Sequence, residues 1–278
     1  MYGIGKVDLV TGVTIYIKIS EDDFLKFQEF YKKYKEFEKI TLTKNIAKNS
    51  ILDFKNFLSN QVNYMNNGQD ITVEEINIKG TDLILKFILL NRMYLENLKE
   101  YIFREFGVNS NQYNEYKKRL KTTDFDFIFL RIIRNYTQHF GLPLSNTGKV
   151  YDSLKELYIE PRFYITKTDL LKAPYKYNEP ELIKENLDDK IIINNYIDIW
   201  IDIITEATKL SEELFVADIK ESFYDFFNKF DYILSNANVI NHHKDGTYNV
   251  YKINKEIYKI IGIYIDKEII KDISSTKI

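Results

Sequence analysis

The chain has 278 residues, enough for one large domain, and its 45% hydrophobic and 29% charged residues are typical of a folded protein. A formal net charge of −2 argues against a protein that coats nucleic acid indiscriminately, although a local basic patch is compatible with it. The absence of cysteine excludes disulfides and thiolate chemistry. It suits a reducing compartment, so we expect a cytoplasmic protein. No apolar run reaches about 18 residues, and no membrane segment is predicted.

The N-terminal region predicts a small hairpin followed by two helices. The segments 6–10 and 13–19 flank Thr11-Gly12, and the period-two alternation over 13–17 is typical of a strand. Ser20 predicts a helix N-cap, with Asp23 three residues later in a position like that of a capping box. A second helix is predicted over 43–65, and Asn66-Asn67-Gly68 is expected to end it.

Three helices are predicted in the middle of the chain. The first covers 81–106, ends at Gly107, and is apolar nearly all round over 83–90, which places it centrally in a bundle. A short polar helix is predicted over 111–121. The third helix is amphipathic and is expected to end at Gly141 and Pro143. Its apolar residues recur at i, i+3, i+4, i+7 and i+11: Phe125, Ile128, Phe129, Ile132 and Tyr136.

The remaining sequence predicts an irregular excursion, long helical structure and a second hairpin. The excursion covers 141–190 and contains a turn signal at Asn146-Thr147-Gly148 and a candidate strand over 162–166. Residues 191–234 contain no Gly or Pro and predict one long helix or two abutting ones. Region 238–278 predicts a hairpin at Asp245-Gly246 and a short helix from Lys255. We therefore predict a mainly α fold, one helical-bundle domain over 1–278, with β-hairpin appendages at 1–20 and in 238–278.

The amphipathic helix carries the residues with the clearest chemistry, in the run Arg134-Asn135-Tyr136-Thr137-Gln138-His139. The chain has three histidines and six arginines, so this combination is rarely expected by chance. A histidine moves protons near neutral pH, and the planar arginine fork binds phosphate oxygens. Asn135 precedes His139 by four residues, one helical turn, so its amide is placed to orient the imidazole. We expect the helices over 81–106 and 191–234 to be the neighbours of this helix.

This hexapeptide resembles the R-N-x-x-x-H signature of the HEPN superfamily (higher eukaryotes and prokaryotes nucleotide-binding domain). The resemblance implies a bundle of HEPN type and a metal-independent endoribonuclease without a cofactor. Arg134 is then expected to contact the scissile phosphate, His139 to move protons and Asn135 to position His139. A role as a toxin or in antiviral defence follows from the resemblance alone, with RNA as the substrate and an antitoxin or activator protein as a further partner.

Helix geometry bears on how these residues combine. Arg134 and His139 are five residues apart, about 140° around a helix, whereas Arg131 is about 80° from His139. Arg134 and His139 therefore do not share one face of the helix, and a single helix does not bring them together in an active site. HEPN proteins are known for composite sites in which two motif helices face each other. The single motif copy then implies a homodimer or a HEPN partner chain.

Several further residues are candidates for binding RNA. The best basic patch is the nearby stretch Lys117, Lys118, Arg119 and Lys121, for which a solvated helix face is the alternative. Around the motif the candidates are Arg131, Tyr136 and Gln138. Tyr136 belongs to the apolar stripe, so core packing is its alternative role, and stacking on a base is the functional one. Arg131 has the alternative of a solvated side chain.

Other patterns leave alternatives open. Glu96, Glu100 and Glu105 are placed to oppose a basic site or simply to cover a helix surface. His242-His243 favours a polar turn over a metal site, because no other His or Cys is near, and no metal is predicted. For Arg134 and His139 the alternative is an ordinary helix end. The alternative function is a non-catalytic HEPN-like protein that binds RNA or a nucleotide, or serves as a scaffold.

Overall fold

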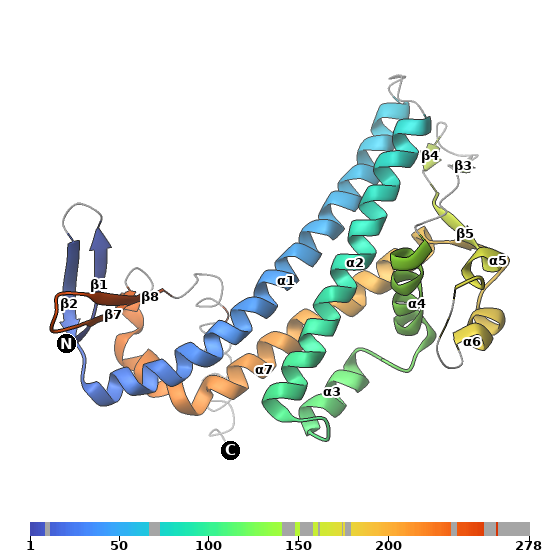
Figure 1. The fold of residues 1–278 in the computed structure, drawn as a ribbon. Coiled ribbons are helices and arrows are strands. Elements are labelled where there is room, and N and C mark those ends of the chain that lie inside the picture. Colours follow the sequence, from blue (N-terminus) through green and yellow to red (C-terminus); the bar gives the residue numbers. More distant parts are fainter. Residues whose placement is uncertain are drawn as a thin grey trace, which may run out of the picture. The chain divides into compact units, whose positions relative to one another are not determined.

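Long α-helices dominate the chain in the computed structural model, and short antiparallel strand pairs accompany them (Figure 1). The structure describes residues 1–8, 12–66, 73–140, 148–150, 158–160, 162–173, 175, 179–234, 238–252 and 260. Its helices are α1 (Glu21–Asn66), α2 (Val73–Phe106), α3 (Asn111–Arg119), α4 (Phe125–Phe140), α5 (Lys167–Leu170), α6 (Glu179–Asn186) and α7 (Asn194–Leu234). The predicted mainly α class is therefore confirmed. Among the described residues, no helix has the length and apolar character needed to span a membrane.

The two predicted terminal hairpins form a single sheet. β1 (Tyr2–Asp8) pairs with β2 (Gly12–Lys18), and β7 (Asn238–His242) pairs with β8 (Tyr248–Tyr251), so both predicted hairpins are present. The first strand begins at Tyr2 rather than at residue 6, and Gly12 of the predicted turn lies in β2. β1 also pairs antiparallel with β7, which gives the strand order β2-β1-β7-β8. The terminal amine of Met1 donates to the backbone oxygen of His242 at 2.8 Å, across 241 positions of sequence. Local sequence patterns do not reveal pairing at this distance, so the sequence predicted two separate appendages.

The first long helix is continuous where the sequence predicted two helices. The backbone N–H of Asp23 donates to the Ser20 hydroxyl at 3.0 Å, which confirms the predicted N-cap. From Glu21, α1 then runs without interruption to Asn66, where the end was predicted. No Gly or Pro occurs between these residues, so nothing in the backbone breaks the helix. For the same reason α7 is one helix rather than two.

One end of α2 agrees with the sequence prediction and the other differs. Gly107 follows the helix with a φ of 87°, and its N–H donates to the Phe103 oxygen at 3.0 Å, as expected of a left-handed cap. At the other end, α2 begins at Val73 rather than at 81, so Gly80 lies inside the helix. A Cβ at Gly80 would lie 2.1 Å from the ring of Phe163. Glycine is needed here for packing, not to break the helix.

The chain divides into two compact units, Met1–Lys39 with Leu210–Ile278, and Ile40–Lys209. In the first unit the rings of Phe37 and Phe215 stack with their centroids 4.0 Å apart. Lys33 Nζ contacts an Asp218 carboxylate oxygen at 2.8 Å in the same unit. A single domain over 1–278 stays a prediction, because a division by contacts does not show whether the units fold separately.

An aromatic core holds the second unit together, with Trp200 of α7 at its centre. Trp200 is fully buried, with ring centroids 6.0 Å from Phe87 of α2 and 5.8 Å from Phe129 of α4. Its indole N–H donates to the backbone oxygen of Asp126 at 3.1 Å. Phe54 of α1 packs against Phe87 at 6.2 Å. The expectation that the 81–106 and 191–234 helices neighbour the motif helix is thus confirmed.

Where the structure describes it, the predicted excursion over 141–190 consists of short elements. β3 (Gly148–Val150) pairs with β4 (Tyr158–Glu160), and β5 (Tyr164–Thr166) pairs with β6 (Lys190–Ile192). β5 corresponds to the strand predicted over 162–166. The predicted turn at Asn146-Thr147-Gly148 lies largely outside the described residues, as does the predicted helix from Lys255. α5 and α6 lie between the strands β5 and β6 in the sequence and bring side chains to the motif helix.

Candidate functional site

The motif lies in the C-terminal half of α4, which is buried on more of its circumference than its stripe predicts. Of the five stripe residues, Phe129, Ile132 and Tyr136 are buried, while Phe125 and Ile128 are half-buried. Other residues of α4 are buried as well: Phe127, Leu130 and Ile133. The additional burial arises because α4 packs against both α2 and α7. Among the described side chains of α4, Arg131 and Arg134 remain partly accessible, and Gln138 and His139 in the last turn are exposed.

Arg134 is half-buried and held by two contacts. Its Nη1 donates to the side-chain oxygen of the neighbouring Asn135 at 3.1 Å, and its Nη2 contacts Glu96 Oε2 of α2 at 3.5 Å. The side chain of Arg134 retains 26% of its exposure, so part of the guanidinium still faces solvent. The predicted positioning of His139 by Asn135 stays a prediction, because Asn135 uses only its oxygen in the contact with Arg134.

His139 lies one turn beyond, near the end of the helix, and is exposed. Gln138 beside it is also exposed. Within the described parts of the chain, no hydrogen bond or ion pair joins His139 to Arg134 or Asn135. The structure therefore does not bring the predicted acid–base group and the predicted cation together within one chain, in line with their separation of about 140° around the helix.

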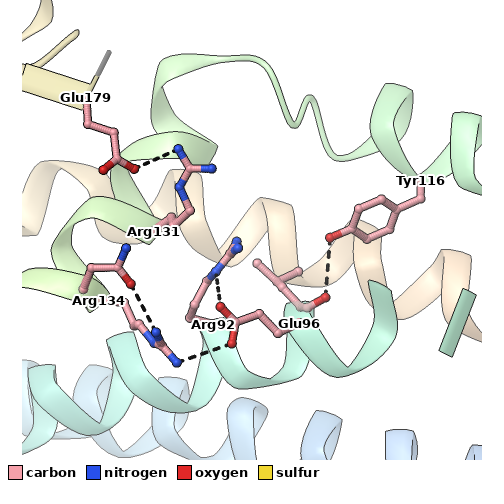
Figure 2. A network of polar contacts seen from close by, with 8 residues as sticks. Arg92, Glu96, Tyr116, Arg131, Arg134 and Glu179 are labelled. Atoms are coloured by element: carbon pink, nitrogen blue, oxygen red, sulfur yellow. Dashed lines mark hydrogen bonds and ion pairs between the residues drawn. The ribbon is translucent and has the colours of Figure 1, made fainter. Parts of the chain in front are cut away.

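Arg131 is paired with a carboxylate from the excursion. Its Nη2 lies 2.9 Å from Glu179 Oε1, at the start of α6 (Figure 2). The Glu179 side chain is only 5% exposed, whereas that of Arg131 is 41% exposed. A solvated Arg131 was the alternative in the sequence, and the structure shows an ion pair with one buried partner instead. Glu179 gave no signal in the sequence, because its partner lies on another helix.

A third arginine, Arg92 of α2, completes the group. Its Nε donates to Glu96 Oε1 at 3.1 Å, so Glu96 bridges Arg92 and Arg134 (Figure 2). Arg92 is 8% exposed and lies over the ring of Phe127, 5.3 Å from the centroid. Burial lowers its pKa, while Glu96 acts in the opposite direction. Sequence reasoning missed Arg92 but included Glu96 among the carboxylates placed to oppose a basic site.

The other two glutamates of that prediction do not oppose this group. Glu105 accepts a hydrogen bond from its neighbour Arg104 at 2.9 Å, and Glu100 is exposed. Of these three glutamates, only Glu96 forms an ion pair with a residue of α4 in the described part of the chain. A four-residue spacing, Arg92 to Glu96, was the available sequence signal, since such pairs meet on one helix face.

The predicted basic patch over 117–121 contains exposed lysines and one arginine that is paired with a carboxylate. Lys117, Lys118 and Lys121 are exposed, and Lys117 Nζ lies 4.9 Å from the ring centroid of Tyr113. Arg119 instead donates from Nε to Glu206 Oε1 of α7 at 2.7 Å. The three lysines of the predicted patch are thus solvated, and Arg119 links α3 to α7 through its ion pair with Glu206.

Tyr136 is buried, as its place in the apolar stripe predicts. It is 5% exposed, which leaves little of its ring for stacking on a base. Burial raises the pKa of Tyr136, Asp169 adds to the rise, and Lys172 opposes it. These charges lie on and just after α5, so the excursion reaches the apolar side of the motif helix as well as its arginine side.

A pocket of about 310 Å³ opens beside Arg119, between the segment joining α3 to α4 and the helix α7. Its polar lining combines the cations of Arg119 and Lys121 with four carboxylates: Asp124, Asp126, Asp202 and Glu206. The surplus of negative charge makes this pocket unsuited to a phosphate group.

Of the adjacent histidines predicted to form a polar turn, His242 ends β7 opposite Tyr248, and His243 begins the connection to β8. His243 Nε2 lies 3.1 Å from the Asn249 amide nitrogen, and the His243 N–H donates to the Thr247 oxygen at 2.8 Å. Among the described residues, no group of three His, Cys, Asp or Glu side chains is placed to hold a metal ion.

The group that combines motif residues with charged residues from other elements therefore consists of Arg92, Glu96, Arg131, Arg134 and Glu179. Comparisons with protein-family models, curated proteins and solved structures found no match to this chain.

Proposed function

We propose that this chain is a metal-independent endoribonuclease of the HEPN type, acting in the cytoplasm as a homodimer or with a HEPN partner chain. The observation that carries the proposal is the run Arg134-Asn135 to His139 at the end of a helix. Arg134 is held there by Glu96 and Asn135 but stays partly exposed, and His139 is exposed. A role as a toxin or in antiviral defence, with an antitoxin or activator protein, comes with the resemblance to HEPN proteins.

The proposed reaction uses the 2′-hydroxyl of RNA as its nucleophile. His139 accepts the proton of that hydroxyl or donates one to the leaving oxygen, as an imidazole does near neutral pH. The bond between O2′ and phosphorus forms while the bond between phosphorus and O5′ breaks. Arg134 stabilises the negative charge that accumulates on the phosphate oxygens. The products carry a 2′,3′-cyclic phosphate and a 5′-hydroxyl.

A composite site fits the geometry better than a site within one chain. Glu96 contacts Arg134 from α2, while His139 lies exposed in the last turn of α4 without a described partner. Two copies of α4 facing each other would place the histidine of one chain near the arginine of the other. The proposal therefore requires a dimer for activity.

The test compares wild type, His139→Ala and Arg134→Ala on total RNA and tRNA in excess EDTA, with the size of each protein measured by light scattering. We expect cleavage by the wild-type dimer and losses of at least about 100-fold for both variants. His243→Ala is the matched control, since it removes another histidine from a turn outside the motif. Intact RNA after incubation with a folded wild-type dimer would contradict the nuclease proposal.

A second candidate function is a non-catalytic HEPN-like protein that binds RNA or a nucleotide, or serves as a scaffold. The observation that favours it is that both motif-helix arginines are already ion-paired, with Glu96 and Glu179. Under this alternative, His139→Ala leaves RNA affinity unchanged and wild type leaves RNA intact. Under the nuclease proposal, the same substitution abolishes cleavage.

A further inference from the structure

Three guanidinium groups meet beside the motif, although only one of them belongs to the Arg-Asn-x-x-x-His pattern. Arg131 and Arg134 are three residues apart on α4 and so are neighbours on its surface. In the view of Figure 2, the guanidinium of Arg92 lies between those of the other two. Repulsion from Arg131 is among the causes that lower the pKa of Arg92, which agrees with their proximity.

The charges in this group do not balance. Three arginines face two glutamates, because Glu96 contacts both Arg92 and Arg134 and Glu179 contacts Arg131. One positive charge remains in a setting where Arg92 and Glu179 are nearly excluded from water. Charge repulsion is strong in such a setting, so one further negative charge would be attracted.

Hydrogen-bond donors in the group are also left over. Arg92 Nη1 and Arg131 Nε are both buried and have no hydrogen-bond partner in the described part of the chain. Arginine carries five N–H donors, and a buried donor without a partner costs about 1–3 kcal/mol. An oxyanion that accepts from the accessible N–H groups of Arg131 and Arg134 supplies the missing negative charge beside these buried donors.

We propose that Arg92, Arg131 and Arg134 together form a binding site for one phosphodiester group, with Arg92 as its buried base and the other two as its partly exposed sides. A phosphodiester carries one negative charge, the amount that the group lacks. The inference rests on the proposed function for the identity of the ligand as RNA. It extends the phosphate contact from Arg134 alone to a residue of α2 and a second residue of α4.

Glu96 has a defined part in this site. It occupies donors of two of the three arginines, and its side chain is 39% exposed. A phosphate oxygen competes with the Glu96 carboxylate for the donors of Arg134. Removal of the negative charge at Glu96 therefore strengthens phosphate binding, whereas a glutamate that only supports the fold would not have this effect.

The experiment measures binding of a fluorescent 2′-O-methyl RNA oligonucleotide by anisotropy at several salt concentrations. This probe retains the phosphodiesters but lacks the nucleophilic hydroxyl, so binding is separated from cleavage. We expect Arg131→Gln to weaken binding about tenfold and to reduce the salt dependence. Arg92→Lys keeps the charge but loses the planar fork, and we expect binding about threefold weaker. Glu96→Gln is expected to bind about threefold more tightly.

Arg104→Gln is the matched control, because it removes an exposed arginine of the same helix α2 outside the group. Thermal unfolding of every variant checks that the fold is intact, and Glu96→Gln tests the site without removing any of its arginines. Unchanged affinity for Arg131→Gln and Arg92→Lys, or no gain for Glu96→Gln, would overturn the inference. Cleavage of unmodified RNA with these same unchanged affinities would leave the nuclease standing without the site. The expected affinities with intact RNA would leave the site standing without the nuclease.

Discussion

The two sides of α4 are stabilised in different ways. On one side, Phe129 and the aromatic core around Trp200 are excluded from water. On the other, Arg131 and Arg134 remain partly exposed and contact carboxylates of α6 and α2. The apolar side obtains its energy from burial, which is large and not directional. The arginine side obtains little net stability, because half-exposed ion pairs contribute about 0–1 kcal/mol. Functional residues are therefore expected on the arginine side, which contributes little to the stability of the fold.

The largest expected effect tests the apolar side. Trp200→Ala removes a fully buried ring that packs against Phe87 and Phe129, together with its hydrogen bond to Asp126. We expect the free energy of unfolding to fall by about 3–5 kcal/mol. Urea unfolding followed by circular dichroism measures it. Ile78→Ala is the control, since Ile78 is 65% exposed and its truncation should cost under about 0.5 kcal/mol. A loss below about 1 kcal/mol for Trp200→Ala would remove the contrast between the sides.

On the arginine side, we expect smaller losses in the free energy of unfolding, and unequal ones for the two partners Arg131 and Glu179. Arg131→Gln leaves a carboxylate that is 5% exposed without its cation, so we expect a loss of about 2 kcal/mol. Glu179→Gln leaves Arg131, which is 41% exposed and can turn to water, so the loss should stay below about 1 kcal/mol. The double variant should recover most of the stability lost by Arg131→Gln. Equal losses from the two single variants, measured by urea unfolding, would show that burial of Glu179 does not matter.

The contrast between the two sides also explains how much of the fold the sequence could predict. Helix spacing within 125–136 identified the apolar side, and the caps at Ser20 and Gly107 were correct, because each depends on neighbouring residues. Pairing of β1 with β7 was missed, since it joins opposite ends of the chain. The predicted helix over 81–106 in fact begins at Val73, so Gly80 lies within α2, where the ring of Phe163 occupies the space of a side chain. Contacts distant in sequence, not local propensity, account for these differences.

The candidate site shows the same division. The run from Arg134 to His139 was visible because its chemistry is contained in six residues. Glu96 was placed as a possible opponent of a basic site, but its bridge between Arg92 and Arg134 depends on how α2 packs against α4. Glu179 was invisible, because the excursion that carries it has no periodic pattern pointing to α4. Motif residues are therefore predictable from the sequence, and the charges that surround them are not.

The smallest expected effect concerns Arg119 and Glu206, a half-exposed pair outside α4. The hydrogen bond from Arg119 holds the pKa of Glu206 below its ordinary value of 4.5, against the opposing effect of burial. A lowered pKa in the folded state stabilises the protein above pH 4.5, and this contribution is lost as the pH falls through the folded value. Because the Glu206 side chain is 31% exposed, we expect Arg119→Gln to cost at most about 1 kcal/mol at pH 7. That difference should shrink in urea unfolding as the pH is lowered below 4.5. A difference that stays constant down to about pH 3 would mean that Arg119 stabilises the fold through packing rather than charge. Half-exposed pairs would then contribute to stability in the same way as the apolar side of α4.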